Sequence, residues 1–375
     1  MSLFGPHIKQ MKEKGDKDGL VRNLKNADTR VRVKVVRALG ELKYIEGLLE
    51  ASKNENVEVR AAAIEALKNL EDPEAVVPLF EILENDTDET IQQEAFEALT
   101  SLGVKEGREI AKMWASVGNA TLKKENPQIA LKCFDEATRI EPGDKELIGS
   151  IAAALSDYGI YQDALKYAEK CTQIDPKDAR GWGLKGICLF HLDNEEEAFS
   201  CCKRALEIDP KLGEARGILS AIYYNRGDYE VLAAHERETL TLDPENIKAR
   251  VMLSDVLALS NKLADAQAEV QEALEMVLAA DYANAEDLAM IYQQLGILSV
   301  MRGHEGALEY FEKSIRANQR DQWIYKVADA YIMLNMFGGL MEGTPQERRA
   351  KLLGYAQNRK RTYGSYLQWK QENGL

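Results

Sequence analysis

Histidine and cysteine are scarce in this sequence, and those present do not form the clusters that catalytic or metal sites require. Its 375 residues include four histidines, scattered without a recognisable catalytic arrangement: His7, His191, His235 and His304. The five cysteines lack the spacing of a disulfide framework or a zinc site: Cys133, Cys171, Cys188, Cys201 and Cys202. We therefore expect reduced packing thiols, as in cytoplasmic proteins, no metal or other cofactor, and no catalytic activity.

Positive charge and long apolar runs are also in short supply. The formal net charge is -14 at pH 7, which argues against a general nucleic-acid-binding protein, because such proteins carry a basic footprint. The basic stretch 9–43 has no interleaved aromatic residues, so we interpret it as a solvated helix face. No apolar run approaches the roughly 20 residues of a membrane span, and the first residues lack a secretory segment. We expect a cytoplasmic protein without membrane contact.

A period of 34 residues organises the middle of the chain. Prolines end four similar segments, "RIEPGD", "QIDPKD", "EIDPKL" and "TLDPEN", at this interval: Pro142, Pro176, Pro210 and Pro244. A second column in the same register contains only small residues: Gly118, Ala152, Gly186 and Ser220. Such a period indicates stacked pairs of antiparallel helices, in which small residues allow close helix packing and proline marks the turn.

Residues 108–320 therefore resemble tetratricopeptide repeats (TPRs), a 34-residue pattern that begins at a tryptophan and ends at a proline. The first unit matches the pattern with Trp114, Val117-Gly118, Ala130, Phe134, Ala137 and Pro142. The third unit also matches, with Trp182, Gly186, Ala198, Ala205 and Pro210, whereas the fifth lacks the proline. The resemblance implies a superhelix of about six helix pairs, whose first helices line a concave groove for partner proteins.

The first hundred residues contain a different repeat. "DTRVRVKVVRALGEL", "NVEVRAAAIEALKNL" and "DETIQQEAFEALTSL" align Val31-Arg32 with Val59-Arg60 and Ile91-Gln92. Between the last two segments, Asp72 and Pro73 predict the start of another helix. These residues resemble the short HEAT-like repeats also seen in phycobilin lyases, although the third unit lacks the arginine. The resemblance leaves a lyase-like enzyme or accessory factor as a remote alternative, because HEAT-like repeats serve many functions.

The expected architecture is an all-α, two-part α-solenoid. We predict HEAT-like repeats in residues 1–107, a TPR array in 108–320 and C-terminal helices in 321–375. The junction "SLGVKEGREIAKMW" contains no flexible linker, so the two repeat types are expected to stack continuously. One C-terminal helix is expected at 321–337. Another should start at the capping box "TPQE" and run from residue 344 to about 370, with apolar and aromatic residues: Leu352, Leu353, Tyr355, Tyr363, Tyr366 and Trp369.

Three columns of the TPR array are expected to face the groove, and we call them the groove-side columns. The first contains three glycines in phase: Ala115, Gly149, Gly183, Gly217 and Val251. The second contains Asn119, Ala153, Ile187, Ala221 and Asp255, and the third Leu122, Ser156, Phe190, Tyr224 and Ala258. Because glycine permits close approach of another backbone, we expect a partner helix or extended apolar segment to pack here. The alternative is that these solvent-facing positions merely tolerate glycine.

The chaperone-binding members of the TPR family hold a C-terminal carboxylate with lysine, asparagine and arginine side chains at set positions. The matching positions here are Ala115, Asn119, Ser150, Arg180 and Leu184, of which only Asn119 is the family residue. The sequence therefore predicts a non-catalytic protein-interaction scaffold or adaptor that is not a carboxylate-clamp co-chaperone. The alternative is a self-associating or autoinhibited module, in which the basic, aromatic C-terminal helix occupies the groove instead of capping the last repeat.

Overall fold

The regular secondary structure of the described residues is helical throughout. The computed structural model describes residues 5–70, 72–102, 107–280, 284–303, 306–318 and 342–358, together with Ile324, Val327, Ala328, Ala330, Tyr331, Leu334 and Leu340. Every regular element in these residues is a helix, which confirms the predicted all-α class. The chain divides into two compact units, residues 1–194 and 195–375. The domain boundaries expected near residues 107 and 320 remain predictions.

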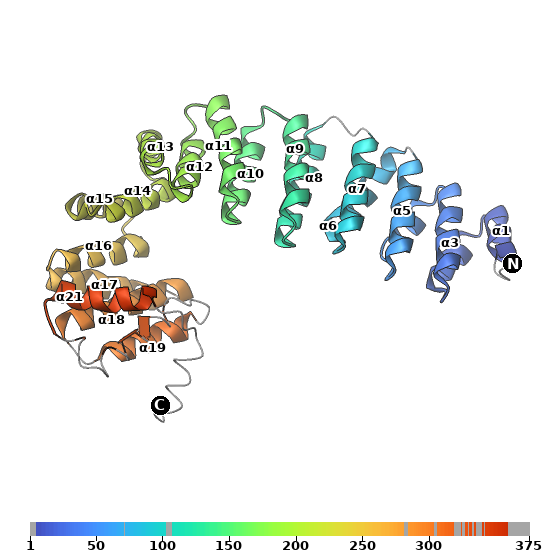
Figure 1. Cartoon of the computed structure of the whole chain (residues 1–375). Helices are drawn as coiled ribbons and strands as arrows, with labels where there is room; N and C mark the ends of the chain where they lie inside the picture. Colours follow the sequence, from blue (N-terminus) through green and yellow to red (C-terminus); the bar gives the residue numbers. More distant parts are fainter. Residues whose placement is uncertain are drawn as a thin grey trace, which may run out of the picture. The chain divides into compact units, whose positions relative to one another are not determined.

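Unit 1 is a series of helices that pack against one another in chain order (Figure 1). The HEAT-like part comprises α1 (Gly5–Lys14), α2 (Lys17–Arg22), η1 (Asn23–Lys25), α3 (Thr29–Glu41), α4 (Ile45–Ala51), α5 (Val57–Asn69), η2 (Pro73–Ala75), α6 (Val76–Asn85) and α7 (Glu89–Ser101). The TPR part comprises α8 (Arg108–Lys123), α9 (Pro127–Ile140), α10 (Lys145–Asp157), α11 (Tyr161–Ile174) and α12 (Ala179–His191). Helices α8 and α9 form the first TPR pair, and α10 and α11 the second.

The described helices of unit 2 also follow one another in chain order. Its elements are α13 (Glu195–Ile208), α14 (Gly213–Arg226), α15 (Tyr229–Leu242), α16 (Ile247–Leu259), α17 (Leu263–Ala279), α18 (Ala285–Arg302), α19 (Ala307–Ala317) and α21 (Pro345–Asn358). Within this unit α16 pairs with α17 and α18 with α19. Most of the helix expected at 321–337 lies outside the described residues, as do Tyr363, Tyr366 and Trp369 of the expected C-terminal helix.

Capping residues define where many of these helices begin. Asp28 and Asp88 accept backbone N–H bonds at the starts of α3 and α7, and Asp72 does the same before Pro73, as predicted. At the start of α21, Thr344 N donates to Glu347 Oε2 at 2.7 Å and Glu347 N donates to Thr344 Oγ1 at 3.2 Å. This reciprocal pair is the predicted capping box, and it satisfies two backbone donors at the helix start.

A column of long polar side chains links successive HEAT-like repeats. Arg60 Nε donates to Asp86 Oδ2 at 2.7 Å, and Arg32 Nη1 donates to Glu55 Oε1 at 3.0 Å. In the third repeat Gln92 replaces the arginine, and Gln92 Oε1 accepts from Asn126 Nδ2 of the first TPR turn at 2.8 Å. The departure from the arginine pattern therefore preserves a bond from each repeat to the next.

The junction between the two repeat types is a continuous core. Trp114 of α8 is 1% exposed. Its ring lies edge-to-face with the rings of Phe80 in α6 and Phe96 in α7, at centroid distances of 4.8 Å and 5.2 Å. Such aromatic contacts add stability beyond the burial of their area. The helices of the HEAT-like part therefore pack directly on the first TPR, as the absence of a flexible linker predicted.

Small residues bring paired helices together where the repeat pattern predicts them. A Cβ added to Gly118 would lie 2.3 Å from Phe134 Cε1, and a Cβ added to Gly296 would lie 2.3 Å from Phe311 Cε1. Both phenylalanine rings are fully buried. The two glycines thus leave the space that a phenylalanine of the partner helix fills, in the first and last TPR pairs alike.

Candidate partner-binding surface

The three glycines of the first groove-side column differ in accessibility. Gly217 on α14 is exposed, with nothing within 4 Å of an added Cβ. Gly149 on α10 is half-buried, and its added Cβ would meet only Cys171 Sγ, at 3.8 Å. Gly183 on α12 is buried, so the expectation of accessible backbone at this position is wrong. Ala115 and Val251 in the same column are also buried.

In unit 1 the groove-side columns form an apolar and uncharged surface. Ala153 of α10 and both Ile187 and Phe190 of α12 are half-buried, and none of the unit 1 residues in these columns is charged. Asn119 on α8 is half-buried as well, and its Oδ1 atom is buried without a hydrogen-bond partner. The polar content of this surface is therefore limited to groups such as this amide and the Ser156 hydroxyl.

In unit 2 the same columns hold a buried ion pair with the C-terminal helix. Arg349 Nη2 of α21 donates to Asp255 Oδ1 at 2.9 Å and contacts Oδ2 at 2.6 Å. The same nitrogen donates to the Tyr224 hydroxyl at 2.8 Å. The side chains of Arg349 and Asp255 are only 12% and 14% exposed. Tyr224 of α14 and Asp255 of α16, both predicted to face the groove, thus contact a third residue that was not predicted from the sequence.

The surroundings of this ion pair keep both the cation and the phenol in their expected protonation states. Burial disfavours the Arg349 cation, but Asp255 and Tyr224 outweigh it and raise the pKa of the guanidinium. Burial also raises the pKa of Tyr224, and the Asp255 carboxylate adds to this effect. Gln294 of α18 is buried, and its Nε2 lies 3.4 Å from Asp255 Oδ1. The Asp255 carboxylate therefore accepts hydrogen bonds from side chains on two other helices, α18 and α21.

Helix α21 packs on α18 (Figure 1), and its buried face carries apolar residues beside the arginine. Leu352 and Ala356 are fully buried. Gln346 Nε2 donates to the Leu259 carbonyl at the end of α16 at 3.3 Å, and Arg348 Nε donates to the Met301 carbonyl near the end of α18 at 3.1 Å. A cation at the C-terminal end of a helix also interacts favourably with the helix dipole.

Gln294 and Arg349 were not predicted from the sequence, although one sequence signal points to Arg349. The "TPQE" capping box predicts where the helix begins. The residues that share one face of this helix can then be identified from their spacing. Arg349, Leu352 and Ala356 lie at i, i+3 and i+7, which is the spacing of a single helix face. Nothing in the sequence indicates which of the many carboxylates on the repeats this arginine contacts.

Unit 2 contains a second buried polar cluster. Its Ser220 and Glu236 occupy the repeat positions that Gly118 and Phe134 occupy in the first TPR. Glu236 on α15 is 3% exposed, and Ser220 on α14 donates a hydrogen bond to its Oε1. Burial raises the pKa of Glu236 to about 7, although Ser220 and Arg216 oppose the shift. His235 is also buried, and burial lowers its pKa. Because these groups are closed to solvent, the cluster cannot reach a substrate.

The cysteines are packing residues. All five are free and buried. Burial raises the pKa of Cys171 and Cys188 to about 11 and that of Cys202 to about 12, which opposes formation of the reactive thiolate. Across the described residues, no group of three or more His, Cys, Asp or Glu side chains could hold a metal ion. No helix among them is long and apolar enough to cross a membrane.

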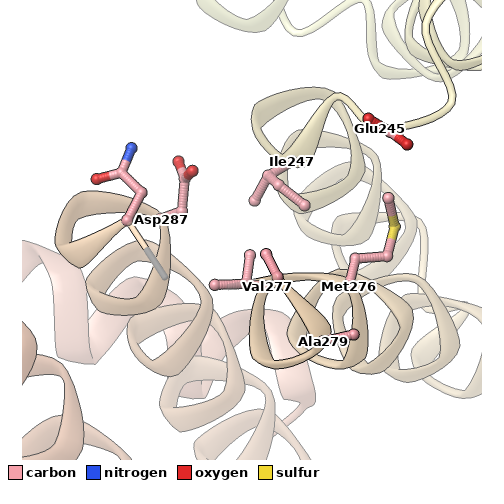
Figure 2. Close-up of a pocket in the computed structure, with 8 residues that line it drawn as sticks. Glu245, Ile247, Met276, Val277, Ala279 and Asp287 are labelled. Carbon is pink, nitrogen blue, oxygen red and sulfur yellow. The ribbon is translucent and has the colours of Figure 1, made fainter. Parts of the chain in front are cut away.

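A pocket of about 430 Å³ opens in unit 2 at the ends of three helices. Its base is apolar, with Ile247 at the start of α16 and Met276 and Val277 near the end of α17. Figure 2 shows the side chains of Ile247 and Val277 pointing toward the same space, with Asp287 of α18 at the edge. Glu245 adds a second carboxylate to the lining. This arrangement offers an apolar contact with an acidic edge and no nucleophile.

These features define the chain as an all-helical repeat protein that combines HEAT repeats with TPRs. Residues 18–103 match the family model of HEAT repeats, and residues 179–212 match the family model of the tetratricopeptide repeat. Both matches lie where the sequence predicted repeats of that kind. No curated protein sequence matches the chain.

Parts of the chain are similar in fold to solved TPR structures. A tetratricopeptide repeat protein from Parabacteroides merdae ATCC 43184 shares 16% identity at a TM-score of 0.46, over 76% of this chain and 99% of that one. PilF of Pseudomonas aeruginosa shares 18% identity at a TM-score of 0.45, over 60% and 99%. YrrB, described as a TPR protein with an unusual peptide-binding site, shares 18% identity at a TM-score of 0.38. The match covers 50% of this chain and 93% of YrrB.

Proposed function

We propose that the chain is a non-catalytic protein-interaction scaffold, which binds a helix or an extended apolar segment on the groove-side columns of its TPRs. One observation carries this proposal: α21 already lies on this side of unit 2, with Arg349 held by Tyr224 and Asp255. Residues that the repeat register assigned to the groove therefore accept a helix of the same chain. A helix of another protein meets the same kind of surface.

The corresponding surface of unit 1 supports the proposal through its chemistry. Ala153, Ile187 and Phe190 are half-buried apolar side chains, and no unit 1 residue of the groove-side columns is charged. Apolar surface removed from water contributes roughly 25 cal/mol per Å², and exposed apolar patches mark interaction sites in folded proteins. The accessible backbone at Gly149 allows a partner segment to approach closely.

Site-specific cross-linking tests the scaffold proposal in the full chain. A photoreactive phenylalanine analogue at Phe190 samples the groove-side surface of unit 1, and the same analogue at exposed Gln162 on α11 is the matched control. We expect a protein cross-linked from position 190 and absent from position 162, and its loss in an Ile187→Asp background. Identical cross-linked proteins from both positions would contradict binding on this surface.

The ion pair between α21 and Asp255 favours a second candidate, an autoinhibited or self-associating module. In this case α21 occupies unit 2 until a partner displaces it, or two chains exchange their C-terminal helices, as in domain swapping. Light scattering over a range of protein concentrations separates the two forms. A monomer at all concentrations supports autoinhibition, and a dimer that depends on Arg349 supports exchange.

The proposal excludes a carboxylate-clamp co-chaperone, because the clamp positions Ala115 and Leu184 are buried apolar residues. A peptide with a free C-terminal carboxylate and its amidated form are expected to bind equally. The proposal also places the chain in a reducing compartment such as the cytoplasm, which five free, buried cysteines support. The raised pKa values of the buried thiols support a non-catalytic role.

A further inference from the structure

We infer that Tyr224, Asp255 and Gln294 form an arginine-reading subsite, and that unit 2 takes a basic amphipathic helix of another protein in competition with α21. This inference rests on the proposed scaffold function and specifies the ligand of its C-terminal part. The partner helix presents an arginine, with apolar residues three and seven positions further on. The resident α21 has this pattern in Arg349, Leu352 and Ala356.

The subsite is assembled from three successive groove-side helices, α14, α16 and α18. Tyr224 and Asp255 contact a single nitrogen of Arg349 at 2.6 to 2.9 Å, and Gln294 lies 3.4 Å from the same carboxylate. A guanidinium is more weakly hydrated than an ammonium and is the preferred cation for buried ion pairs. With both partners more than four-fifths covered, this environment favours arginine over lysine.

The apolar part of the pattern comes from the buried face of α21. Leu352 and Ala356 are fully buried, whereas Ala350, Lys351 and Gln357 are exposed. Residues at i, i+3 and i+7 share one helix face, so the arginine and the two apolar side chains enter the surface together. Recognition therefore combines a charged contact at Asp255 with apolar burial one and two turns further along the helix.

The fit of the resident helix is imperfect, which makes it displaceable. Arg349 Nε is buried without a hydrogen-bond partner, and an unsatisfied buried donor carries the full cost of its lost hydration. Among the described helices α21 packs on α18, and residues 318–344 lie between α19 and α21 in sequence. A helix from a partner that satisfies this donor, or places the guanidinium so that two nitrogens meet the carboxylate, competes effectively for the same position.

Fluorescence anisotropy with labelled peptides of residues 343–358 tests the inference in the full chain. The peptides carry the natural sequence, Arg349→Lys or Arg349→Ala, and the receiving chain carries Arg349→Ala to weaken its own α21. We expect the natural peptide to bind about tenfold or more tightly than the lysine peptide, as for loss of a charge-assisted hydrogen bond. Adding Asp255→Asn to the receiving chain is expected to abolish this difference. Equal binding of the arginine and lysine peptides would overturn the arginine-reading subsite.

Amide hydrogen exchange of α21 in the full chain provides a second measurement that needs no added peptide. Arg349→Lys and Tyr224→Phe are expected to speed exchange across Pro345–Asn358, whereas Gln357→Ala, on the exposed face of the helix, is expected to leave it unchanged. Slow exchange in every variant, together with no peptide binding, would show that α21 is a fixed cap and would overturn the inference. The cross-linking result at Phe190 in unit 1 would stand independently of that outcome.

Light scattering distinguishes the source of the helix. A monomeric natural chain supports a helix from another protein. A dimer that Asp255→Asn dissociates would overturn that assignment, because the occupant would then be α21 of a second copy.

Discussion

The groove-side columns of the two units have the same repeat register but different chemistry. In unit 1 they present half-buried apolar side chains such as Ile187 and Phe190. In unit 2 they present Tyr224 and Asp255, which hold the arginine of a helix from the same chain. Positions that share one repeat register can therefore carry different chemistry, because the register sets the place on the helix and not the side chain.

Matched aspartate substitutions test the difference between covered and open positions and should give the largest effect. Val300 on α18 is fully buried, whereas Ile187 on α12 is half-buried. We expect Val300→Asp to destabilise the protein by roughly 4 kcal/mol or more, because it buries an unpaired charge. Ile187→Asp, at a half-buried position where the carboxylate can reach water, is expected to cost about 1 kcal/mol. Urea denaturation followed by circular dichroism measures both.

Similar destabilisation by both substitutions would show that the surface of unit 1 is covered as fully as that of α18. Val300→Ala is the control for loss of packing alone, since it removes methyl groups without adding charge.

The pH dependence of stability tests a second contrast, between Phe134 in the first TPR and Glu236 at the same column of the fourth. The pKa of Glu236 is about 7 in the fold and 4.5 for an unperturbed glutamate, so the folded state holds its proton more tightly. This stabilisation is complete below pH 4.5 and is lost as the pH rises through 7. The loss amounts to about 3 kcal/mol, at 1.36 kcal/mol per pKa unit.

Thermal unfolding between pH 4.5 and 8 checks this expectation. Glu236→Gln keeps the shape and removes the titration, so its stability should not fall over this range. The lowered pKa of His235 acts in the opposite direction, because its stabilisation is present above pH 6.5 and is lost as the pH falls. A natural chain as insensitive to pH as Glu236→Gln would show that the carboxyl group is not buried in solution.

Alanine at two glycines should give the smallest effects, and with opposite signs. Gly118→Ala places a Cβ 2.3 Å from the Phe134 ring, and such overpacking typically costs about 1–3 kcal/mol. Gly217→Ala meets nothing within 4 Å and should stabilise α14 by roughly 0.5–1 kcal/mol, because glycine disfavours the helix. Melting temperatures of the two variants check both signs. Destabilisation by Gly217→Ala would show that the open position is filled in solution.

Much of the fold could be predicted from the sequence because its signals are local. The 34-residue period of Pro142 and its successors, the small residue at Gly118 and the Thr344–Glu347 capping box each depend on neighbours within one or two helices. Local geometry of this kind leaves a regular spacing in the chain. The HEAT-like column of Arg32, Arg60 and Gln92 could also be predicted from the sequence. The hydrogen bond between Gln92 and Asn126 could not.

The candidate site was predictable only in part. The register placed Tyr224 and Asp255 on the groove side, but it treated the three in-phase glycines as equivalent, whereas Gly183 is buried and Gly217 is open. Burial depends on what packs over a position, and the repeat pattern describes only the repeat itself. A column of identical residues can therefore contain different environments.

The sequence by itself determined the all-α class and the two repeat types, because both follow from helix periodicity and short-range packing. Only the tertiary structure decided that Arg349 reaches Asp255, its partner 94 positions away in the sequence, and that α21 lies on α18. A contact over such a separation leaves no spacing rule in the chain. It depends on how the folded helices stack and on which carboxylate that stacking brings within reach of the guanidinium.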